Sequence, residues 1–369
     1  MTHANPIDPL ALLKLGTVPR LGSQRIRNLM ARFKSPQRVF HASLRELVQV
    51  DGVDKTLAEK IRAGGDAAFV ESQTRLLEAH QAQLISYWDA AYPAPLKKTV
   101  DAPILLYVRG DVNLLKGPAI AVVGTRAPST YGKLVTDTLA RELVANGITI
   151  VSGFARGVDT IAHSAAFKAG GTTVAVLGSG VDVIYPYENQ KLAADLVQQK
   201  KGALLSEFPM GSKPDAPHFP RRNRIISGMT PATLIIEAGL KSGALITADF
   251  ALEQGRDVLA VPGNINSPKS VGCNYLIQQG AKLVSKIDDI LEELHLPSKQ
   301  HDSPSADDRL KQLSGVEARV YSVLNSDPQH IDKISAACQL SISETLGVLL
   351  SLELRNYVNQ YAGKHFVKT

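Results

Sequence analysis

The segment AIAVVGTRAPSTYGK, residues 119–133, decides the fold of this 369-residue chain. It opens with a short apolar run rich in β-branched side chains, turns at Gly124, and continues into a stretch that Ser129 or Thr130 can cap as a helix. A strand, a glycine turn and a helix in this order begin a βαβ unit. The segment therefore predicts a parallel sheet covered by helices on both faces.

The same alternation continues toward the C-terminus. We expect strands at residues 120–123, 148–151, 173–177, 203–205, 233–236, 258–261 and 282–284. Between them we expect helices that end before glycines, at residues 131–146, 161–169 and 245–254. Residues 86–118 are expected to add a strand to this sheet. The predicted fold is α/β, a Rossmann-like, doubly wound and mostly parallel sheet that occupies residues 86–295.

Two smaller domains are expected to flank this sheet. In residues 1–85, the segments LGSQRIRNLMARF (21–33) and VDGVDKTLAEKIRAG (50–64) each place a glycine before an amphipathic helix. They resemble helix-hairpin-helix units, whose turn amides can hold a DNA phosphate, so we expect a small helical domain of the SAM or helix-hairpin-helix kind. The alternative is a plain helical bundle. Residues 296–313 are typical of a polar linker. Residues 314–369 show three helices and a hairpin, the order of a winged helix.

Composition excludes several classes of protein. Hydrophobic residues make up 44% and charged residues 21% of the chain, which is ordinary for a globular protein. The two cysteines, Cys273 and Cys338, lie far apart without His or Cys neighbours at ligand spacing, so we expect neither a disulfide framework nor a metal site. No apolar stretch reaches the roughly 18 residues of a membrane span. We expect a soluble, cytoplasmic protein that does not enter a membrane.

The positive charge suggests a polyanionic partner. The formal net charge is +6, and Lys plus Arg outnumber Asp plus Glu by 12 to 8 in residues 1–85 and by 21 to 19 in residues 86–295. The counts are equal in the linker and in the tail, at 3 to 3 and 5 to 5. We therefore expect phosphate contacts from the first two domains, and in the second from local clustering.

The loops after the predicted strands carry the candidate binding residues, because ligands of open α/β sheets lie beyond the carboxyl ends of the strands. GTRAPSTYGK (124–133) offers Gly124 and Arg126, and SGFARGVD (152–159) offers Gly153, Arg156 and Gly157 as a second anion cradle, with Asp159 able to cap a helix. EAGLKSGALITA (237–248) adds Lys241, Ser242 and Gly243.

Three arginines stand close together in FPRRNRIISG (219–228). Of Arg221, Arg222 and Arg224, we expect Arg224 to point at the sheet edge. The alternative is that these side chains are solvated or pair with acids such as Glu207 and Glu237.

Nucleotide cofactors do not fit these loops. A dinucleotide site needs G-x-G-x-x-G after the first strand and an acid about 20 residues later, and both are missing. A P-loop would place its first glycine at Ala127 and its hydroxyl at Leu134. We therefore expect no cofactor.

The ordered motifs VVGTRAPSTYG, SGFARGVDTIAH, LGSGVDVIYPYEN, HFPRRNRIISG, EAGLKSGALITA and VPGNINSP resemble the DNA-processing protein A family, also called Smf, across residues 86–295. The resemblance implies a homodimer, formed through the Rossmann-like domain, that binds single-stranded DNA and loads the RecA recombinase during natural transformation. It implies no catalysis, so no catalytic residue is assigned.

The resemblance also extends the candidate site. It adds Thr125, Ser152, Phe219, Arg221 and Asn223, and more weakly Lys191 after the YPYEN segment. Phe154, Phe219 and Tyr131 are aromatic residues that can wedge against a base. The full set of candidate DNA-binding residues is Gly124, Thr125, Arg126, Ser152, Gly153, Phe154, Arg156, Gly157, Lys191, Phe219, Arg221, Asn223, Arg224, Lys241, Ser242 and Gly243.

Two other functions remain open. Nucleoside-monophosphate phosphoribohydrolases use a related fold, and Glu237 in TPATLIIEAG could mimic their catalytic acid, although Pro231 and Ala232 replace the phosphate-binding glycines. The second alternative is a protein scaffold whose arginines lie on the surface without binding DNA.

The predicted recognition helix of the tail, SISETLGVLLSLEL, has no Lys or Arg, so we expect the winged helix to contact proteins rather than duplex DNA.

Overall fold

The computed structural model describes residues 7–297, 313, 315–325, 327–354, 357–361 and 363–368. Contacts divide the chain into two compact units, Met1–Ser298 and Lys299–Thr369. The linker predicted for residues 296–313 lies outside the described residues, apart from Leu296, Pro297 and Leu313.

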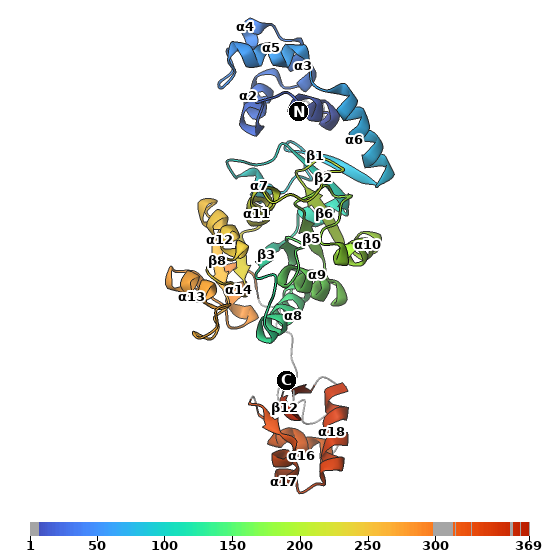
Figure 1. The fold of residues 1–369 in the computed structure, drawn as a ribbon, viewed down its shortest axis with the longest axis vertical. Coiled ribbons are helices and arrows are strands. Elements are labelled where there is room, and N and C mark those ends of the chain that lie inside the picture. Colours follow the sequence, from blue (N-terminus) through green and yellow to red (C-terminus); the bar gives the residue numbers. More distant parts are fainter. Residues whose placement is uncertain are drawn as a thin grey trace. The chain divides into compact units, whose positions relative to one another are not determined.

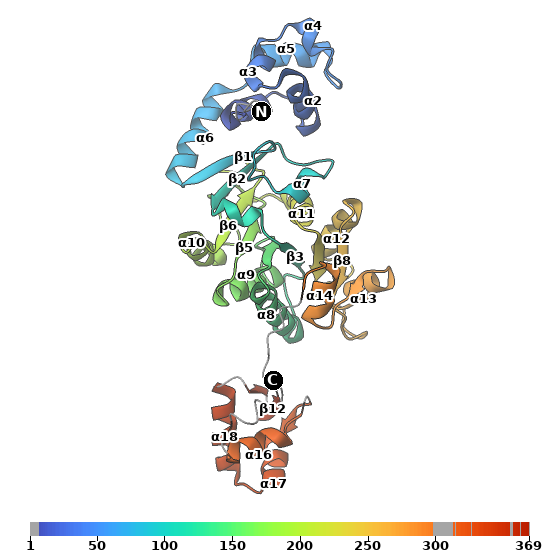
Figure 2. The same ribbon diagram turned by 180° about the vertical axis from the view of Figure 1, so that it is seen from behind.

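A nine-stranded sheet forms the centre of the first unit (Figure 1, Figure 2). Its strands are β1 (Ala82–Ser86), β2 (Leu105–Gly110), β3 (Ala119–Val123), β4 (Thr149–Ser152), β5 (Thr173–Val176), β6 (Gly202–Ser206), β7 (Ala232–Ile235), β8 (Asp257–Ala260) and β9 (Lys282–Leu283). Their order in the sheet is β1-β2-β6-β5-β4-β3-β7-β8-β9. The strands from β3 to β9 are parallel to one another. Strand β2 pairs antiparallel with β6 on one side and with β1 on the other. The predicted fold class is confirmed, and each predicted strand lies within one residue of its predicted ends.

The segment before β3 contributes two strands rather than the one predicted. Strand β1 lies mostly in residues that we assigned to the helical domain, and it pairs with β2, with Ala82 opposite Arg109. Its sequence, AQLIS, is short and contains a polar Gln83, so the apolar alternation that marks a strand is weak there.

Helices cover both faces of the sheet. They are α7 (Ala94–Lys97), α8 (Thr130–Ala145), α9 (Val158–Lys168), α10 (Gln190–Gln198), α11 (His218–Gly228), α12 (Gly243–Glu253), α13 (Val271–Gln278) and α14 (Ile287–Glu293), with 3-10 turns η1 (Val112–Leu115) and η2 (Tyr187–Asn189). Alternate residues of β3 face opposite layers, so Ile120 and Val122 pack with α8 and α9, while Ala121 and Val123 pack with α11 and α12. Figure 1 shows α8 and α9 side by side beneath β3.

Helix α9 begins three residues earlier than predicted. Gly157 is its N-cap, with φ 83° and ψ −128°, a conformation that places a sharp turn directly before Val158. Helix α12 similarly begins at Gly243, behind the capping side chain of Ser242.

The front of the chain is helical, as expected. It comprises α1 (Pro9–Gly16), α2 (Ser23–Phe33), α3 (Pro36–His41), α4 (Leu44–Leu47), α5 (Lys55–Ala63) and α6 (Ala67–Ala79). Helices α1 to α5 share a hydrophobic core that also takes in Ile104. The Gln73 side chain joins this region to the sheet domain by exchanging two hydrogen bonds with the backbone of Met210, at 2.8 and 3.2 Å.

The second unit is a winged helix, which confirms the prediction. Its elements are α16 (Gly315–Val323), β10 (Gln329–His330), α17 (Ile331–Cys338), α18 (Ile342–Leu354), β11 (Val358–Tyr361) and β12 (His365–Lys368), with the strands in the order β10-β12-β11.

Among the described residues, no single helix is long and apolar enough to cross a membrane, and only the bent pair of α17 and α18 passes such a test by length and composition.

Candidate nucleic-acid interface

The order of the strands creates a crevice at the carboxyl end of β3. Strands β4, β5 and β6 follow one another on one side of β3, and the next strand in the chain, β7, lies on the other side of β3. Connections leave in opposite directions at such a switch point, which opens a space between the loops. A groove of about 770 Å³ lies there, between the loop after β3, the start of α11 and the start of α12.

The loop after β3 forms one wall of the groove. The Thr125 amide donates a 2.7 Å hydrogen bond to the Glu237 carbonyl, which ties this loop to the end of β7. Gly124 is required because a Cβ there would lie 2.6 Å from Cγ2 of Val158. Arg126 is exposed, and its guanidinium carbon lies 5.5 Å from the centre of the Phe219 ring. The loop therefore presents one exposed cation at the groove.

The loop after β4 is closed by a carboxylate of the chain itself. Asp159 does not cap α9 from outside as predicted; it lies in the first turn and accepts hydrogen bonds from the Gly153 and Ala155 amides, at 3.1 and 3.2 Å. Burial raises the pKa of the Asp159 carboxyl. Two amides expected to cradle an anion are thus already used, so the second cradle is not open in this structure.

Arg222 is the arginine that reaches the sheet edge, which the sequence analysis assigned to Arg224. Its side chain is 4% exposed and donates to the carbonyls of Gly153 and Val176, at the ends of β4 and β5. Gly153 makes room for it, because a Cβ there would lie 2.3 Å from the guanidinium. Burial lowers the pKa of Arg222 to about 10, an effect that Asp159 partly offsets. Arg222 therefore stays charged at neutral pH beneath the groove.

The assignment of Arg224 is wrong for a physical reason. Its guanidinium lies 2.5 Å from Glu207 and 3.2 Å from Asp101, and its side chain is only 11% exposed. Arg224 instead follows the alternative prediction, in which these arginines pair with an acid such as Glu207. Arg221 lies 3.6 Å from the same carboxylate but keeps 61% of its side chain exposed.

The spacing of the apolar residues contained the signal for Arg222. Ile225 and Ile226, three and four positions further along α11, are buried against the sheet. Residues at these spacings share one face of a helix, so Arg222 shares the face of Ile225 and Ile226 that packs on the sheet.

Two other candidates after β4 are structural. The Phe154 side chain is fully buried and its ring lies 5.1 Å from that of His163, so the expectation that it wedges against a base is wrong. The Ser152 hydroxyl is also buried and donates to the Val122 carbonyl at 2.6 Å. Residue 154 has φ 59°, which turns its side chain away from the loop and into the protein.

The aromatic side chains that do line the site are Phe219 and Tyr185. Their ring centres are 5.9 Å apart, and Tyr185 is 42% exposed. Together with Arg126, Arg156 and Gly153 they surround a small pocket that continues from the groove. Arg156 forms a 2.6 Å ion pair with Glu188, with both side chains more than half exposed. This pair is readily broken by a competing phosphate, because exposed ion pairs are worth little.

The far side of the groove comes from α12 and the loop after β8. Lys241, Ser242 and Gly243 line it, together with Asn223 of α11. Lys269 also lines it and donates a 2.6 Å hydrogen bond to the Ala127 carbonyl. We did not predict Lys269 from the sequence, because the motif VPGNINSP that precedes it carries no charge. Lys191 is exposed on α10 and does not line either cavity.

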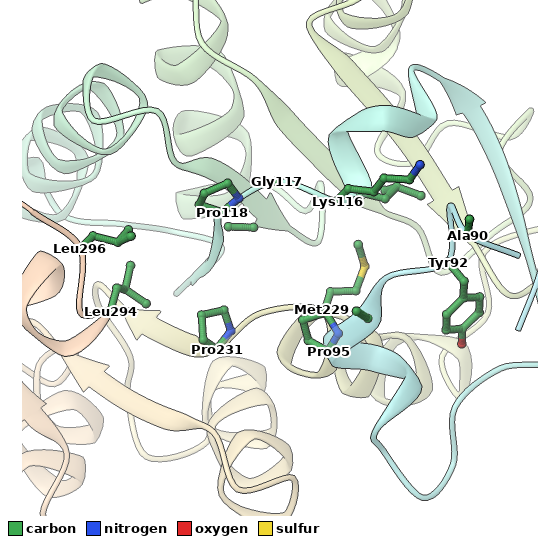
Figure 3. A pocket seen from close by; sticks show the side chains of 13 residues that line it. Ala90, Tyr92, Pro95, Lys116, Gly117, Pro118, Met229, Pro231, Leu294 and Leu296 are labelled. Atoms are coloured by element: carbon green, nitrogen blue, oxygen red, sulfur yellow. The ribbon is translucent and has the colours of Figure 1, made fainter. Parts of the chain in front are cut away.

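A second, more apolar cavity of about 340 Å³ lies at the opposite edge of the sheet. It is lined by residues that precede β3 and β7, including Pro118 and Pro231, with Leu294 and Leu296 at one end and Tyr92 at the other (Figure 3). Its one charged lining residue is Lys116. With one lining cation against the four of the groove, this cavity is the weaker candidate for a nucleic-acid interface.

Comparison with known proteins agrees with the fold. The family model of DNA recombination-mediator protein A matches residues 83–295, more than half of the chain, and that of the DprA winged helix domain matches residues 304–364. The chain belongs to this family. Protein Smf of Escherichia coli is 39% identical over 302 residues, which cover 80% of this chain and 79% of the relative.

Two solved structures of the family are similar. The X-ray structure of DNA processing protein A from Streptococcus pneumoniae has a TM-score of 0.68 at 37% identity, and the match covers 78% of this chain and 98% of that one. A structure of DNA processing protein A from Helicobacter pylori, which gives insight into the single-stranded DNA binding mode of that protein, has a TM-score of 0.52 at 33% identity. The match covers 58% of this chain and 96% of that one. Membership of a family of recombination mediators sets aside the phosphoribohydrolase alternative.

Proposed function

We propose that this recombination-mediator family member binds single-stranded DNA in the groove without reading its sequence, and loads RecA onto the strand during natural transformation and homologous recombination in the cytoplasm. One observation carries the DNA-binding part. The groove lies at the switch point, with Arg126, Lys241 and Lys269 around it and the charge of Arg222 beneath it. The Helicobacter pylori structure, which gives insight into a single-stranded DNA binding mode, supports the same class of ligand.

The mode of binding follows from the side chains available. Arg126 and the two lysines can each contact a phosphate, and Phe219 with Tyr185 offers ring faces to a neighbouring base. Phosphates carry no sequence information and every base has a ring face. Binding of this kind is independent of sequence and weakens steeply as salt is added.

Replacing Arg126 by alanine tests the proposal. We expect a lower affinity for an oligo-dT strand and a slope of log affinity against log salt that is smaller by about 0.7, the value for one phosphate contact to a single strand. Fluorescence anisotropy titrations at several salt concentrations measure both. Lys168→Ala is the matched control, because Lys168 is exposed at the far end of α9, outside the groove. An unchanged slope for the Arg126 variant would rule out the groove as the binding site.

The winged helix is proposed to contact a protein rather than DNA. Its helix α18 carries no Lys or Arg in its sequence and exposes Ile342, Leu346 and Leu350, four residues apart on one face. Such a stripe suits a protein surface and lacks the cations that dominate DNA affinity.

Removal of residues 299–369 is therefore expected to leave the affinity for single-stranded DNA within about twofold of that of the full chain, because the cations of the groove remain in place. The same anisotropy titration measures this. A sharp loss of affinity would contradict the assignment of the winged helix to protein contacts.

Homodimerisation and the RecA contact are further parts of the proposal. Exposed apolar side chains on the β9 side of the sheet support a second copy as partner; they are Leu240, Ile246, Ile265, Tyr275 and Leu283. The RecA contact rests on the family's description as a recombination mediator.

A further inference from the structure

The charge surplus of the whole chain lies in one small part of it. Residues 9–64, which we call the basic helical module, contain 11 Lys and Arg against 4 Asp and Glu. The other residues hold 30 against 31. The sheet domain, with 21 against 19 in residues 86–295, has a surplus of only 2, whereas this module has a surplus of 7 with which to attract a polyanion from a distance.

Most of these cations are free to face a ligand. Every residue of the module is described in the structure, and its one ion pair is that of Arg20 with Asp54, at 3.1 Å and about half exposed. Four of the cations, Arg38, Arg45, Lys55 and Arg62, have exposed side chains that make no hydrogen bond within the described part of the chain. Their positive charge is thus not neutralised inside the protein.

The module is a preformed platform rather than a flexible tail. Its helices α1 to α5 close over a core of large apolar side chains, among them Leu12, Leu29, Leu47 and Ile61, which are fully buried. A basic surface of fixed shape fits a ligand that is itself stiff and evenly charged.

One side chain holds the two glycine turns of the module together. Arg25 donates to the Gly52 carbonyl at 2.8 Å and to the Arg20 carbonyl at 2.7 Å. Gly52 has φ 80°, and a Cβ there would lie 3.3 Å from the Arg25 side chain. Asn28 adds a bond to the Asp51 carbonyl, so α2 lies along the second turn. The cations that flank the turns, Arg20 and Lys55, therefore keep a fixed spacing.

The exposed surface of the module lacks what a single strand requires. Its one exposed large hydrophobic side chain is Val48, and Phe33 and Phe40 are partly covered. Binding of single strands depends on stacking of bases on aromatic side chains, whereas contact with duplex DNA can rest on phosphates alone.

We propose that the basic helical module is a second nucleic-acid surface, which binds the sugar-phosphate backbone of duplex DNA. It is independent of the single-strand groove, because different residues form the two sites. A chain with both surfaces can hold the junction at which a duplex meets an unpaired strand.

The test compares two versions of the full-length chain that have lost the same amount of charge. In the first, the exposed cations of the module are neutralised by Arg38→Gln, Arg45→Gln, Lys55→Gln and Arg62→Gln. In the control, four exposed lysines of the sheet domain are neutralised by Lys98→Gln, Lys116→Gln, Lys168→Gln and Lys200→Gln. The probes are a blunt duplex of about 20 base pairs and an oligo-dT strand, each titrated at several salt concentrations.

We expect the module variant to lose at least about tenfold in duplex affinity, with a salt slope smaller by about 0.9 for each phosphate contact removed. Its affinity for oligo-dT should stay within about twofold of the parent chain, and the control variant should keep its duplex affinity. Equal duplex affinity in the two variants, or an equal loss in both, would overturn the proposal. If the groove is not the single-strand site, a different result shows it: oligo-dT binding that is unchanged by Arg126→Ala.

Discussion

Replacing Arg222 by methionine is expected to destabilise the protein by about 3–5 kcal/mol, the range found when one partner of a buried ionic network is removed. The guanidinium is fully covered and joins the ends of two neighbouring strands through the Gly153 and Val176 carbonyls. Methionine fills a similar volume but leaves these carbonyls without a donor and Asp159 without a nearby cation. Urea denaturation of the sheet domain measures the loss.

The same variant should bind oligo-dT more weakly, because the loop after β4 loses its anchor and the groove loses the charge beneath it. For the stability measurement, Arg221→Met is the matched control, since Arg221 is the preceding residue on α11 and its side chain is 61% exposed. We expect that substitution to change the stability by less than about 0.5 kcal/mol. Similar effects for the two variants would show that the buried guanidinium has no special role.

Replacing Gly157 by alanine is expected to abolish most single-strand binding, with at least about a tenfold loss of affinity, because the loops after β3 and β4 meet at this residue. A Cβ at Gly157 would lie 2.3 Å from the Thr125 carbonyl oxygen and 2.7 Å from that of Arg126. Neither contact is possible, so the loop that carries Arg126 must move away from the groove. Anisotropy titration with oligo-dT measures the effect.

Gly170→Ala separates this clash from simple backbone strain. Gly170 also has a positive φ, 75°, but nothing lies within 4 Å of the Cβ that the substitution would add. Both variants place an alanine at a positive φ, which strains the backbone, but only Gly157→Ala should lose DNA affinity. Equal affinities would mean that the two loops need not approach each other for binding.

Strands and turns could be predicted because their signals are local. The alternation of Ile120 and Val122 with Ala121 and Val123 is readable from the chain, and both faces of β3 are buried as it requires. Glycine positions were equally informative, since Gly124 and Gly157 stand where backbone segments come within van der Waals contact. Strand β1 was missed because its short sequence lacks such a pattern.

The candidate site was only partly predictable. The loops at the end of β3, the start of α12 and the start of α11 do come together at the groove. Within them, the roles of individual side chains depend on partners far away in sequence: Glu207 and Asp101 hold Arg224, and the ends of β4 and β5 hold Arg222. Phe154 turns inward and Asp159 occupies amides that a ligand was expected to use.

By itself the sequence determined a doubly wound sheet with helical domains at both ends, and a set of basic, glycine-rich loops at one edge of that sheet. Only the tertiary structure decided which cation is buried beneath the groove, which is neutralised, and which is free. The physical reason is that hydrophobic periodicity and glycine turns act over a few residues, whereas the environment of a charge is set by whatever carbonyls and carboxylates the fold places around it.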